Sequence, residues 1–384
     1  MPHPFASRAR LVEPFLAVEM MERALELERA GAEVLHLEFG EPDFAPPPAV
    51  LEVCARAMKE GETRYTESRG IAELREAIAR DHQRRSGVSV DPGRIIVTNG
   101  TSPAMLLVFL LLVEPGDEVI LGTPHYACYP NFVRVAGGEP VFVPTDPAEG
   151  YRLDPERVRR AITPRTRAIV LASPANPTGA VQDAATVRAL AQLGVPFVSD
   201  EIYDGLVYDD ARTTSALGLG EDVYVLDGFS KRYAMTGFRL GYVIAPERAV
   251  RPLQTLAQNL FLSTNHFVQR GGIAALEHGQ DTVRAMREAY AQRREQMLAG
   301  VRELGLEVAT PPLGAFYVFA DARKFDPDSR RLASALLERA HVAVTPGVDF
   351  GAAGEGFLRF SYAAADDTIR RALERLADVL GAPA

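Results

Sequence analysis

Short apolar runs recur from residue 94 onward, separated by loops rich in proline or glycine and by stretches with helical periodicity. This alternation is typical of strand–helix–strand units, which build a mostly parallel sheet with helices on both faces. The runs occupy residues 95–97, 118–121, 140–143, 168–171, 196–199, 223–226 and 240–244. The loop before the last run is too short for a full crossover helix beyond Ala234, so we expect the last strand to be antiparallel. The pattern therefore predicts an α/β fold around a seven-stranded sheet.

The remaining segments predict a second, smaller α/β unit. Helical periodicity or length marks residues 11–38 (which end in an extended stretch), 71–85, 248–303 and 367–380, and further apolar runs lie at 316–319, 342–344 and 357–360. We expect a large domain over residues 45–270 and a small domain built from residues 1–44 and 271–384.

Composition narrows the setting in which the protein works. The net charge of −9 argues against nucleic acid as the main partner. The longest apolar run, residues 105–113, is too short to cross a bilayer, so we expect no membrane insertion and a helix buried under the sheet. The two cysteines suggest neither disulfides nor zinc, and the seven histidines lack metal-binding spacing, so no metal is expected. The N-terminus lacks the order of a signal peptide, and a cytoplasmic location follows as an expectation.

The lysines are the most informative charged residues. Only three of the 42 basic residues are lysine: Lys59, Lys231 and Lys324. An amine can lose its proton and form an imine with a carbonyl, whereas a guanidinium cannot. Lys59 and Lys324 stand among charged residues, but Lys231 follows an apolar strand and precedes small and aromatic residues. That context favours a desolvated amine with a lowered pKa.

Polar or aromatic residues follow most of the predicted strands, where ligands bind in open α/β sheets. In chain order these residues are Thr98-Asn-Gly100-Thr101-Ser102, Thr123-Pro-His-Tyr126, Ser173-Pro-Ala-Asn176-Pro-Thr-Gly179, Asp200-Glu-Ile-Tyr203 and Ser230-Lys231. Small residues before the helix at 101 leave backbone N–H groups free for a phosphate. Separately, Arg359 lies in an apolar strand, where a buried cation needs an anionic partner.

As a group, these motifs resemble the fold type I pyridoxal-phosphate enzymes of the aspartate aminotransferase superfamily, class I and II. The resemblance rests chiefly on Ser-Pro-Ala-Asn176-Pro-Thr-Gly, Asp200-Glu-Ile-Tyr203, Phe-Ser-Lys231 and Thr-Gly-Phe-Arg239-Leu-Gly, and it covers nearly the whole chain. Supporting motifs are Gly40-Glu-Pro-Asp-Phe, Tyr65-Thr, Gly314-Ala-Phe-Tyr, Thr345-Pro-Gly and Leu358-Arg359-Phe-Ser. It implies a mostly parallel seven-stranded sheet with helices on both faces, a smaller α/β domain and pyridoxal 5′-phosphate as cofactor.

The resemblance also implies a role for each matching residue. Lys231 would hold the cofactor as a Schiff base and act as acid and base, and Asp200 would pair with the pyridine nitrogen. Asn176 and Tyr203 would bond the ring oxygen, and Tyr126 would stack on the ring, although core packing of that tyrosine is also plausible. The phosphate would be held by Gly100, Thr101, Ser102, Ser230, Arg239 and Tyr65 of the partner subunit. Gly40, Asn176 and Arg359 would bind the substrate, with Arg359 holding its α-carboxylate.

These roles predict a homodimeric aminotransferase that moves the amino group of an L-amino acid to a 2-oxo acid by a ping-pong mechanism. A carbon–sulfur β-lyase on the same scaffold would use the same residues. A non-catalytic effector module is disfavoured, because such modules carry a preceding DNA-binding domain and here the pattern starts within about the first dozen residues. The choice of amino acid, the roles of His125, His266 and Arg69, and the effect of Gly228, where relatives often have serine, stay open.

Overall fold

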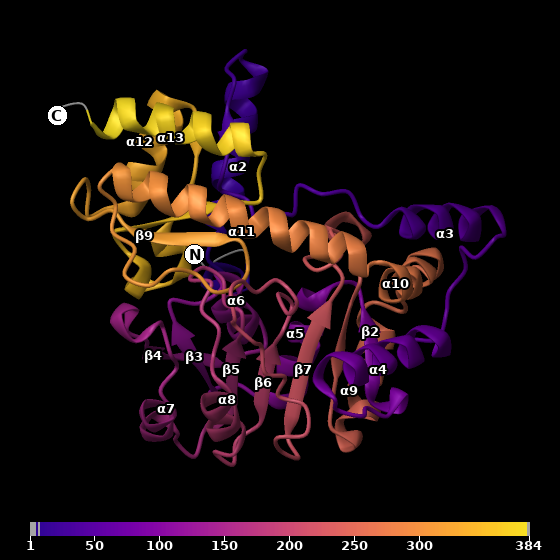
Figure 1. Ribbon diagram of the computed structural model, residues 1–384. Helices are drawn as coiled ribbons and strands as arrows, with labels where there is room; N and C mark the ends of the chain where they lie inside the picture. The colour runs from indigo at the N-terminus through magenta and orange to yellow at the C-terminus, as the bar shows by residue number, and fades with distance from the viewer. Residues whose placement is uncertain (1–4, 7, 382–384) are drawn as a thin grey trace.

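A mostly parallel sheet forms the centre of the large part of the molecule (Figure 1). The computed structural model describes residues 5, 6 and 8–381, so the ends of the predicted small domain, 1–4, 7 and 382–384, lie outside it. Within the described residues the large sheet has seven strands. Their order across the sheet is β2 (Ile95–Thr98), β8 (Gly241–Ile244), β7 (Val223–Gly228), β6 (Phe197–Asp200), β5 (Thr166–Ala172), β3 (Glu118–Thr123) and β4 (Glu139–Pro144). Only β8 runs antiparallel to its neighbours, which confirms both the strand pattern and the expected direction of the last strand.

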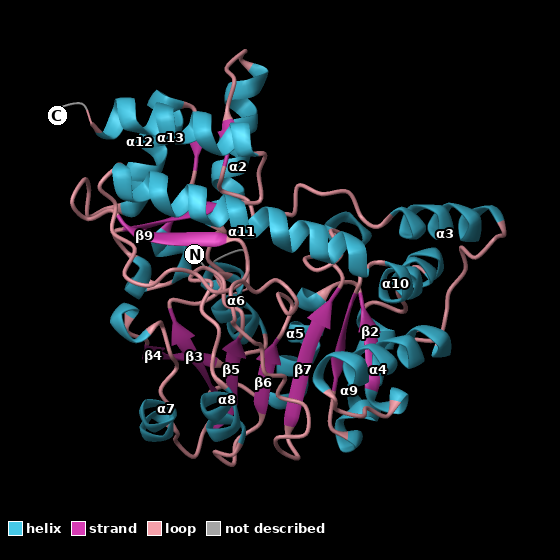
Figure 2. Cartoon of the chain, in the orientation of Figure 1, coloured by secondary structure: helices cyan, strands magenta, loops and turns pink. Residues whose placement is uncertain are grey.

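Helices cover both faces of this sheet because apolar side chains point alternately to either side of each strand (Figure 2). On β3, Val119 and Leu121 join one core and Ile120 joins the other. The first core is closed by α5 (Thr101–Leu112), α6 (Cys128–Val135) and α9 (Glu247–Leu260). The second is closed by α3 (Pro48–Lys59), α4 (Ala72–Ser86), α7 (Pro155–Ala161), α8 (Ala184–Ala191) and α10 (His266–His278).

Helix α5 confirms the prediction of a helix buried under the sheet. Leu107, Val108 and Phe109 are fully buried, and apolar residues make up nearly all of the helix after its first turn. Among the described residues, none of the helices has the length and apolarity needed to cross a membrane.

The smaller α/β layer joins the two ends of the chain. Its strands are β9 (Tyr317–Asp321), β12 (Phe357–Ser361) and β11 (Thr345–Pro346), which pair antiparallel, and β1 (Leu35–His36) and β10 (Val342–Ala343), which pair in parallel. Its helices are α2 (Leu16–Arg29), α11 (Gln280–Glu303), α12 (Ser329–Ala340) and α13 (Asp366–Leu380). The β1–β10 pairing places the N-terminal segment beside the C-terminal part, as the two-segment small domain predicts, while its boundaries at residues 45 and 270 stay a prediction.

Shorter elements complete the chain. They are α1 (Arg8–Leu11) and the 3₁₀ turns η1 (Pro92–Arg94), η2 (Pro147–Glu149), η3 (Thr236–Phe238), η4 (Gly347–Phe350) and η5 (Ala352–Gly354). In Figure 1, α11 runs between the large sheet and the layer that contains α12 and α13. The carboxyl ends of the parallel strands point toward the smaller layer, so a site at those ends is bounded by both parts of the molecule.

Candidate active site

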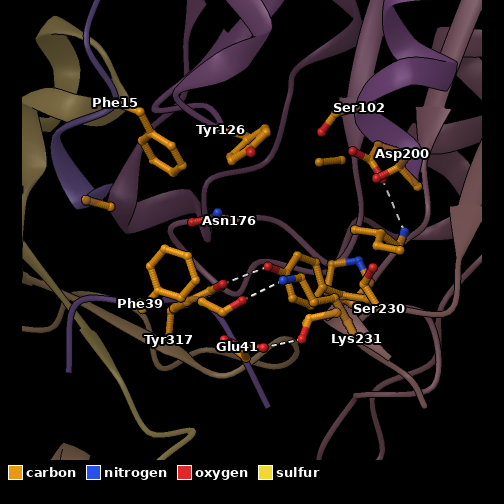
Figure 3. Close-up of a pocket in the computed structure, with 18 of the residues that line it drawn as sticks. Phe15, Phe39, Glu41, Ser102, Tyr126, Asn176, Asp200, Ser230, Lys231 and Tyr317 are labelled. Carbon is orange, nitrogen blue, oxygen red and sulfur yellow. Dashed lines mark hydrogen bonds between the residues drawn. The ribbon is translucent and has the colours of Figure 1, made fainter. Parts of the chain in front are cut away.

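A cavity of about 380 Å³ lies between the carboxyl ends of the large sheet and the smaller layer (Figure 3). The site residues predicted from sequence that line it are Gly40, Thr101, Ser102, Tyr126, Asn176, Asp200, Tyr203, Ser230, Lys231, Arg239 and Arg359. Gly100 stands directly before the helix that reaches the cavity. Tyr65 does not line it and is 82% exposed, on the loop between α3 and α4. One chain therefore brings together the predicted set apart from the residue expected from a partner.

Lys231 follows β7 and directs its amine into the cavity. The Nζ donates a hydrogen bond to the carbonyl oxygen of Gly40. Burial lowers the pKa of Lys231 to about 8, and the nearby charge of Glu41 opposes that shift. An amine with this pKa has a substantial neutral fraction near neutral pH, which a proton acceptor or nucleophile requires.

Asp200 is the last residue of β6 and is buried. The hydroxyl of Tyr129, on α6, donates to its Oδ2 at 2.6 Å, and the Ile202 amide donates to its Oδ1 at 3.2 Å. Burial raises the pKa of Asp200 to about 6 despite these two bonds. A buried carboxylate in this state gains stability from a cation placed against it. Sequence reasoning missed Tyr129; its position three residues after Tyr126, at the start of the short helix that follows that loop, was the available signal.

Tyr203 and Tyr317 form a hydroxyl pair at the cavity wall. Their hydroxyl oxygens are 2.7 Å apart, and burial raises the pKa of Tyr203 well above its usual range. Tyr317 begins β9 and was not among the predicted site residues, although the Gly314-Ala-Phe-Tyr motif that contains it was recognised. Tyr126 also lines the cavity and meets Phe15 edge-on, with ring centroids 5.9 Å apart.

Arg359, on β12, is a buried cation that forms no ion pair with the described residues. Its Nη1 donates to Asn176 Oδ1 at 2.9 Å, and its Nη2 donates to Thr345 Oγ1 at 3.0 Å and to the carbonyl of Glu38. The buried Nε has no hydrogen-bond partner. The guanidinium also lies 4.4 Å from the ring centre of Tyr317. A desolvated charge held only by neutral groups is suited to an anionic ligand.

A second positive site lies at the N-terminus of α5. Gly100 has φ +100°, and a Cβ built there would come within 2.6 Å of Arg239 Nη2. Arg239 follows η3, donates to the Thr236 carbonyl at 3.1 Å and makes no ion pair with any described residue. The free amides that begin α5 and this guanidinium together favour a phosphate. Only glycine allows the two to approach so closely.

Close packing between two strands explains why residue 228 is a glycine. It pairs with Gly241 across β7 and β8, and a Cβ at residue 228 would lie 3.0 Å from the carbonyl oxygen of Leu240 and 3.1 Å from the Cα of Gly241. A larger residue at this position would press on the backbone of β8.

A buried charge network lies beside the site. Arg85, on α4, donates to Asp81 Oδ2 at 2.6 Å, to Asp227 Oδ2 at 3.0 Å and to Asp204 Oδ2. Arg232, next to Lys231, reaches Asp81 at 3.6 Å. The network ties α4 to the segments that carry Tyr203 and Lys231.

The three residues whose roles the sequence left open, His125, His266 and Arg69, do not line the cavity. His125 stacks on Phe142 and its Nδ1 lies 3.0 Å from the Tyr126 carbonyl oxygen, His266 lies 3.7 Å from Glu62, and Arg69 donates to the Gly93 carbonyl at 2.9 Å. These contacts indicate structural roles. Among the described residues, His, Cys, Asp and Glu side chains form no cluster of three or more that could hold a metal ion.

Comparison with known proteins places these residues in a family context. Residues 32–376 match the family model described as aminotransferase class I and II. The aspartate/prephenate aminotransferase of Thermus thermophilus is 43% identical over 381 residues, which cover 97% of this chain and 98% of that protein. The valine–pyruvate aminotransferase of Mycobacterium tuberculosis is 36% identical over 377 residues, or 95% of this chain and 96% of that one.

Solved structures agree with the fold. The aspartate aminotransferase from Thermus thermophilus with maleate superposes with a TM-score of 0.94 at 42% identity, covering 98% of this chain and 100% of that chain. An aminotransferase from Mycobacterium tuberculosis gives a TM-score of 0.94 at 35% identity, covering 99% of each chain. The predicted fold type I architecture is confirmed.

Proposed function

Because the chain belongs to the class I and II aminotransferase family, we propose that the cavity around Lys231 is its active site and that the lining residues have the roles set out below. The enzyme depends on pyridoxal 5′-phosphate and transfers amino groups between amino acids and 2-oxo acids. Membership of this family favours transamination over the β-lyase and effector alternatives. The observation that carries the proposal is an amine whose pKa is lowered by burial and which lies between two positive sites, one at Arg239 and one at Arg359.

The residues present fit the cofactor. The cradle between Gly100 and Arg239, which a Cβ would fill, supplies a phosphate site together with Thr101, Ser102 and Ser230. Pyridoxal phosphate, when bound, supplies an electron sink that stabilises negative charge at the substrate Cα. Asp200 would stay ionised against the protonated pyridine nitrogen, which offsets the cost of its burial.

Other side chains would orient the ring. The Oδ1 of Asn176 accepts from Arg359, which leaves its amide nitrogen as a donor to the ring oxygen. Tyr203, held by Tyr317, would donate to the same oxygen, and Tyr126 would cover a face of the ring.

Lys231 would move the reacting proton. Its neutral Nζ would take the proton from the substrate Cα as general base, and the ammonium so formed would then act as general acid and give the proton to the cofactor carbon rather than back to Cα. The Gly40 carbonyl, which accepts its hydrogen bond here, lies on the wall that would meet the substrate. Arg359 would hold the α-carboxylate and so fix which Cα bond faces the amine.

The experiment that tests these roles replaces Lys231 by alanine. We expect the purified Lys231→Ala protein to be folded but to lose transamination, because no other lysine lines the cavity. Lys324→Ala, which removes an exposed lysine, is the matched control and should keep full activity. Transamination at the wild-type rate in Lys231→Ala would refute the assignment.

We further propose that the enzyme is a homodimer whose partner completes the site. Tyr65 is 82% exposed, and its loop bonds to a second segment with exposed apolar side chains through the Thr66 amide and Ser263 Oγ at 3.3 Å. Leu260 and Leu262 on that segment are 51% and 45% exposed. Coexpressing Lys231→Ala with Tyr65→Ala subunits tests the sharing: mixed dimers should recover activity, because one of their two sites is intact. A monomer in sedimentation analysis would refute it.

We also propose that the enzyme is located in the cytoplasm. Cys54 and Cys128 are free thiols, as expected in a reducing compartment. The names of the relatives cover acidic and apolar amino acids, aspartate and valine, so family membership leaves the side chain of the substrate to the residues of this cavity.

A further inference from the structure

Among the described residues of this one chain, no basic side chain at the cavity is left over for an acidic substrate side chain. The basic residues of that part of the chain that line the cavity are Lys231, Arg239 and Arg359. In the proposed function, on which this inference rests, all three residues already have a role. The Lys231 amine transfers the proton, and the guanidinium groups of Arg239 and Arg359 bind the phosphate and the α-carboxylate. A second carboxylate on the substrate would therefore be buried here without a partner, which is strongly unfavourable.

The remaining charge at the wall has the wrong sign for such a substrate. Glu41 follows Gly40 in the chain, lines the cavity and accepts a hydrogen bond from the Thr236 hydroxyl. Its charge is close enough to act on the Lys231 amine. Glu41 is exposed, so water screens its repulsion, and the absent cation remains the stronger argument.

Apolar side chains instead occupy the wall away from Lys231. Figure 3 shows Phe15 and Phe39 on the left of the cavity, with Lys231 and Ser230 on the right. Phe15 contacts the Tyr126 ring edge-to-face, with an angle of 88° between the ring planes, and Ala17, two residues later, also lines the cavity. Aromatic rings in this arrangement offer large apolar contact area to a ligand.

The position of this wall is fixed by one buried carboxylate. Asp349, in η4, accepts hydrogen bonds from the Leu16 amide at 2.8 Å and the Ala17 amide at 3.2 Å. These are the first two amides of α2, where a negative charge is favoured by the helix dipole. Burial raises the pKa of Asp349 to about 6, but this value still lies below 7, and the carboxylate is therefore mostly ionised at neutral pH. The segment that carries Phe15 is thereby anchored to the smaller layer.

We propose that this aminotransferase selects amino acids with an uncharged, apolar side chain, which binds against Phe15, Ala17, Phe39 and Tyr126, and that Asp349 is the positioning residue of this wall. The assignment departs from the aspartate named for the Thermus relative. It deepens the proposed function by giving the substrate class of the same site.

The test follows the cofactor absorbance of the holoenzyme in single turnovers with L-phenylalanine, L-leucine, L-aspartate and L-glutamate. We expect the apparent second-order constants for phenylalanine or leucine to exceed those for aspartate and glutamate at least tenfold. Equal or faster reaction with an acidic amino acid would overturn the proposal and show that the partner subunit supplies a cation. No absorbance change with any amino acid would instead overturn the proposed function beneath it.

Two variants test the wall itself. Phe15→Ala should lower the ratio of kcat/KM between phenylalanine and alanine by about 10- to 100-fold, because the ring contact is lost. Asp349→Asn should lower the same ratio through KM, while the cofactor affinity, measured by fluorescence titration, stays at the wild-type value. If Asp349→Asn lowered kcat/KM for phenylalanine and for alanine by the same factor, Asp349 would have a merely structural role, and its assignment would be overturned.

Discussion

The assignment of Arg359 to the substrate carboxylate can be tested by removing one charge at a time from the enzyme and from the ligand. The structure gives this arginine three neutral acceptors, at Asn176, Thr345 and the Glu38 carbonyl, and a buried Nε with no partner. Arg359→Met removes the charge and keeps the length of the side chain. Arg359→Lys keeps the charge but loses the planar fork that meets both carboxylate oxygens.

The expected magnitude follows from the burial of the pair. Losing one partner of a buried, hydrogen-bonded charge pair costs about 2–5 kcal/mol, so kcat/KM for the amino acid should fall about 30- to several-thousand-fold in Arg359→Met. Stability should change less, because two effects oppose each other. The variant leaves Asn176 Oδ1 without a donor, at about 1–3 kcal/mol, whereas the Glu38 carbonyl still accepts from the Thr345 hydroxyl. It also relieves a buried cation whose burial costs several kcal/mol.

The assay compares an accepted amino acid with the amine that lacks its carboxylate. Both are given to wild type and to Arg359→Met, and the half-reaction is followed by cofactor absorbance. If Arg359 holds the carboxylate, wild type should discriminate strongly against the amine, and the variant should react with both at similar low rates. The coupling between the two deletions measures the contact directly.

If Arg359→Met slowed the half-reaction of the amino acid and of the amine by the same factor, the reasoning would be refuted. Arg359→Met would then have damaged the site without touching a carboxylate contact. Circular dichroism and the cofactor spectrum of the variant provide the control, since both should match wild type.

Three further predictions test other parts of the site and fold. With the cofactor removed, labelling of Lys231 by an amine-directed reagent, followed by peptide mass spectrometry, should rise with a midpoint near pH 8, because burial lowers its pKa; a midpoint above pH 10 would contradict this. Gly100→Ala should raise the Kd for the cofactor about tenfold or more, because φ +100° strains alanine and its Cβ would displace Arg239; an unchanged Kd would exclude this cradle. The bond to Glu38 raises the pKa of His36 to about 9, so its stabilisation is complete below about pH 6.5 and is lost as pH rises through 9. The difference in free energy of unfolding between wild type and His36→Gln, measured by urea titration, should therefore shrink over that range, by about 1 kcal/mol or less for this partly exposed side chain, and a growing difference would count against it.

The sequence predicted what depends on local pattern. The seven runs became strands because alternate residues, such as Ile120 and its neighbours on β3, face different cores. Lys231 and Asp200 were predicted to lie together because the ends of parallel strands share one rim, and both line the cavity. The order of the motifs along the chain added the predicted chemistry, which is that of a pyridoxal-phosphate enzyme.

What the sequence did not predict depends on contacts between distant segments. Tyr129 reaches Asp200 across 71 residues, Tyr317 reaches Tyr203 across 114, and Asp349 anchors Leu16 across 333. No local periodicity encodes these approaches. Tyr129 meets Asp200 only once α6 has packed on the large sheet, and Tyr317 meets Tyr203 only once the smaller layer has packed against the rim.

The buried network at Arg85 has a consequence for how the enzyme comes to be assembled. Its partners Asp204 and Asp227 lie 119 and 142 residues later in the chain, so these contacts close long loops within the large domain. Closing loops of this length costs chain entropy, so we expect the network to form late in folding. The loops that carry Tyr203 and Lys231 would then reach their final spacing only when α4 has docked. Uptake of the cofactor would in that case report on completion of the large domain, because a nascent chain that has not closed this network would have no site to fill.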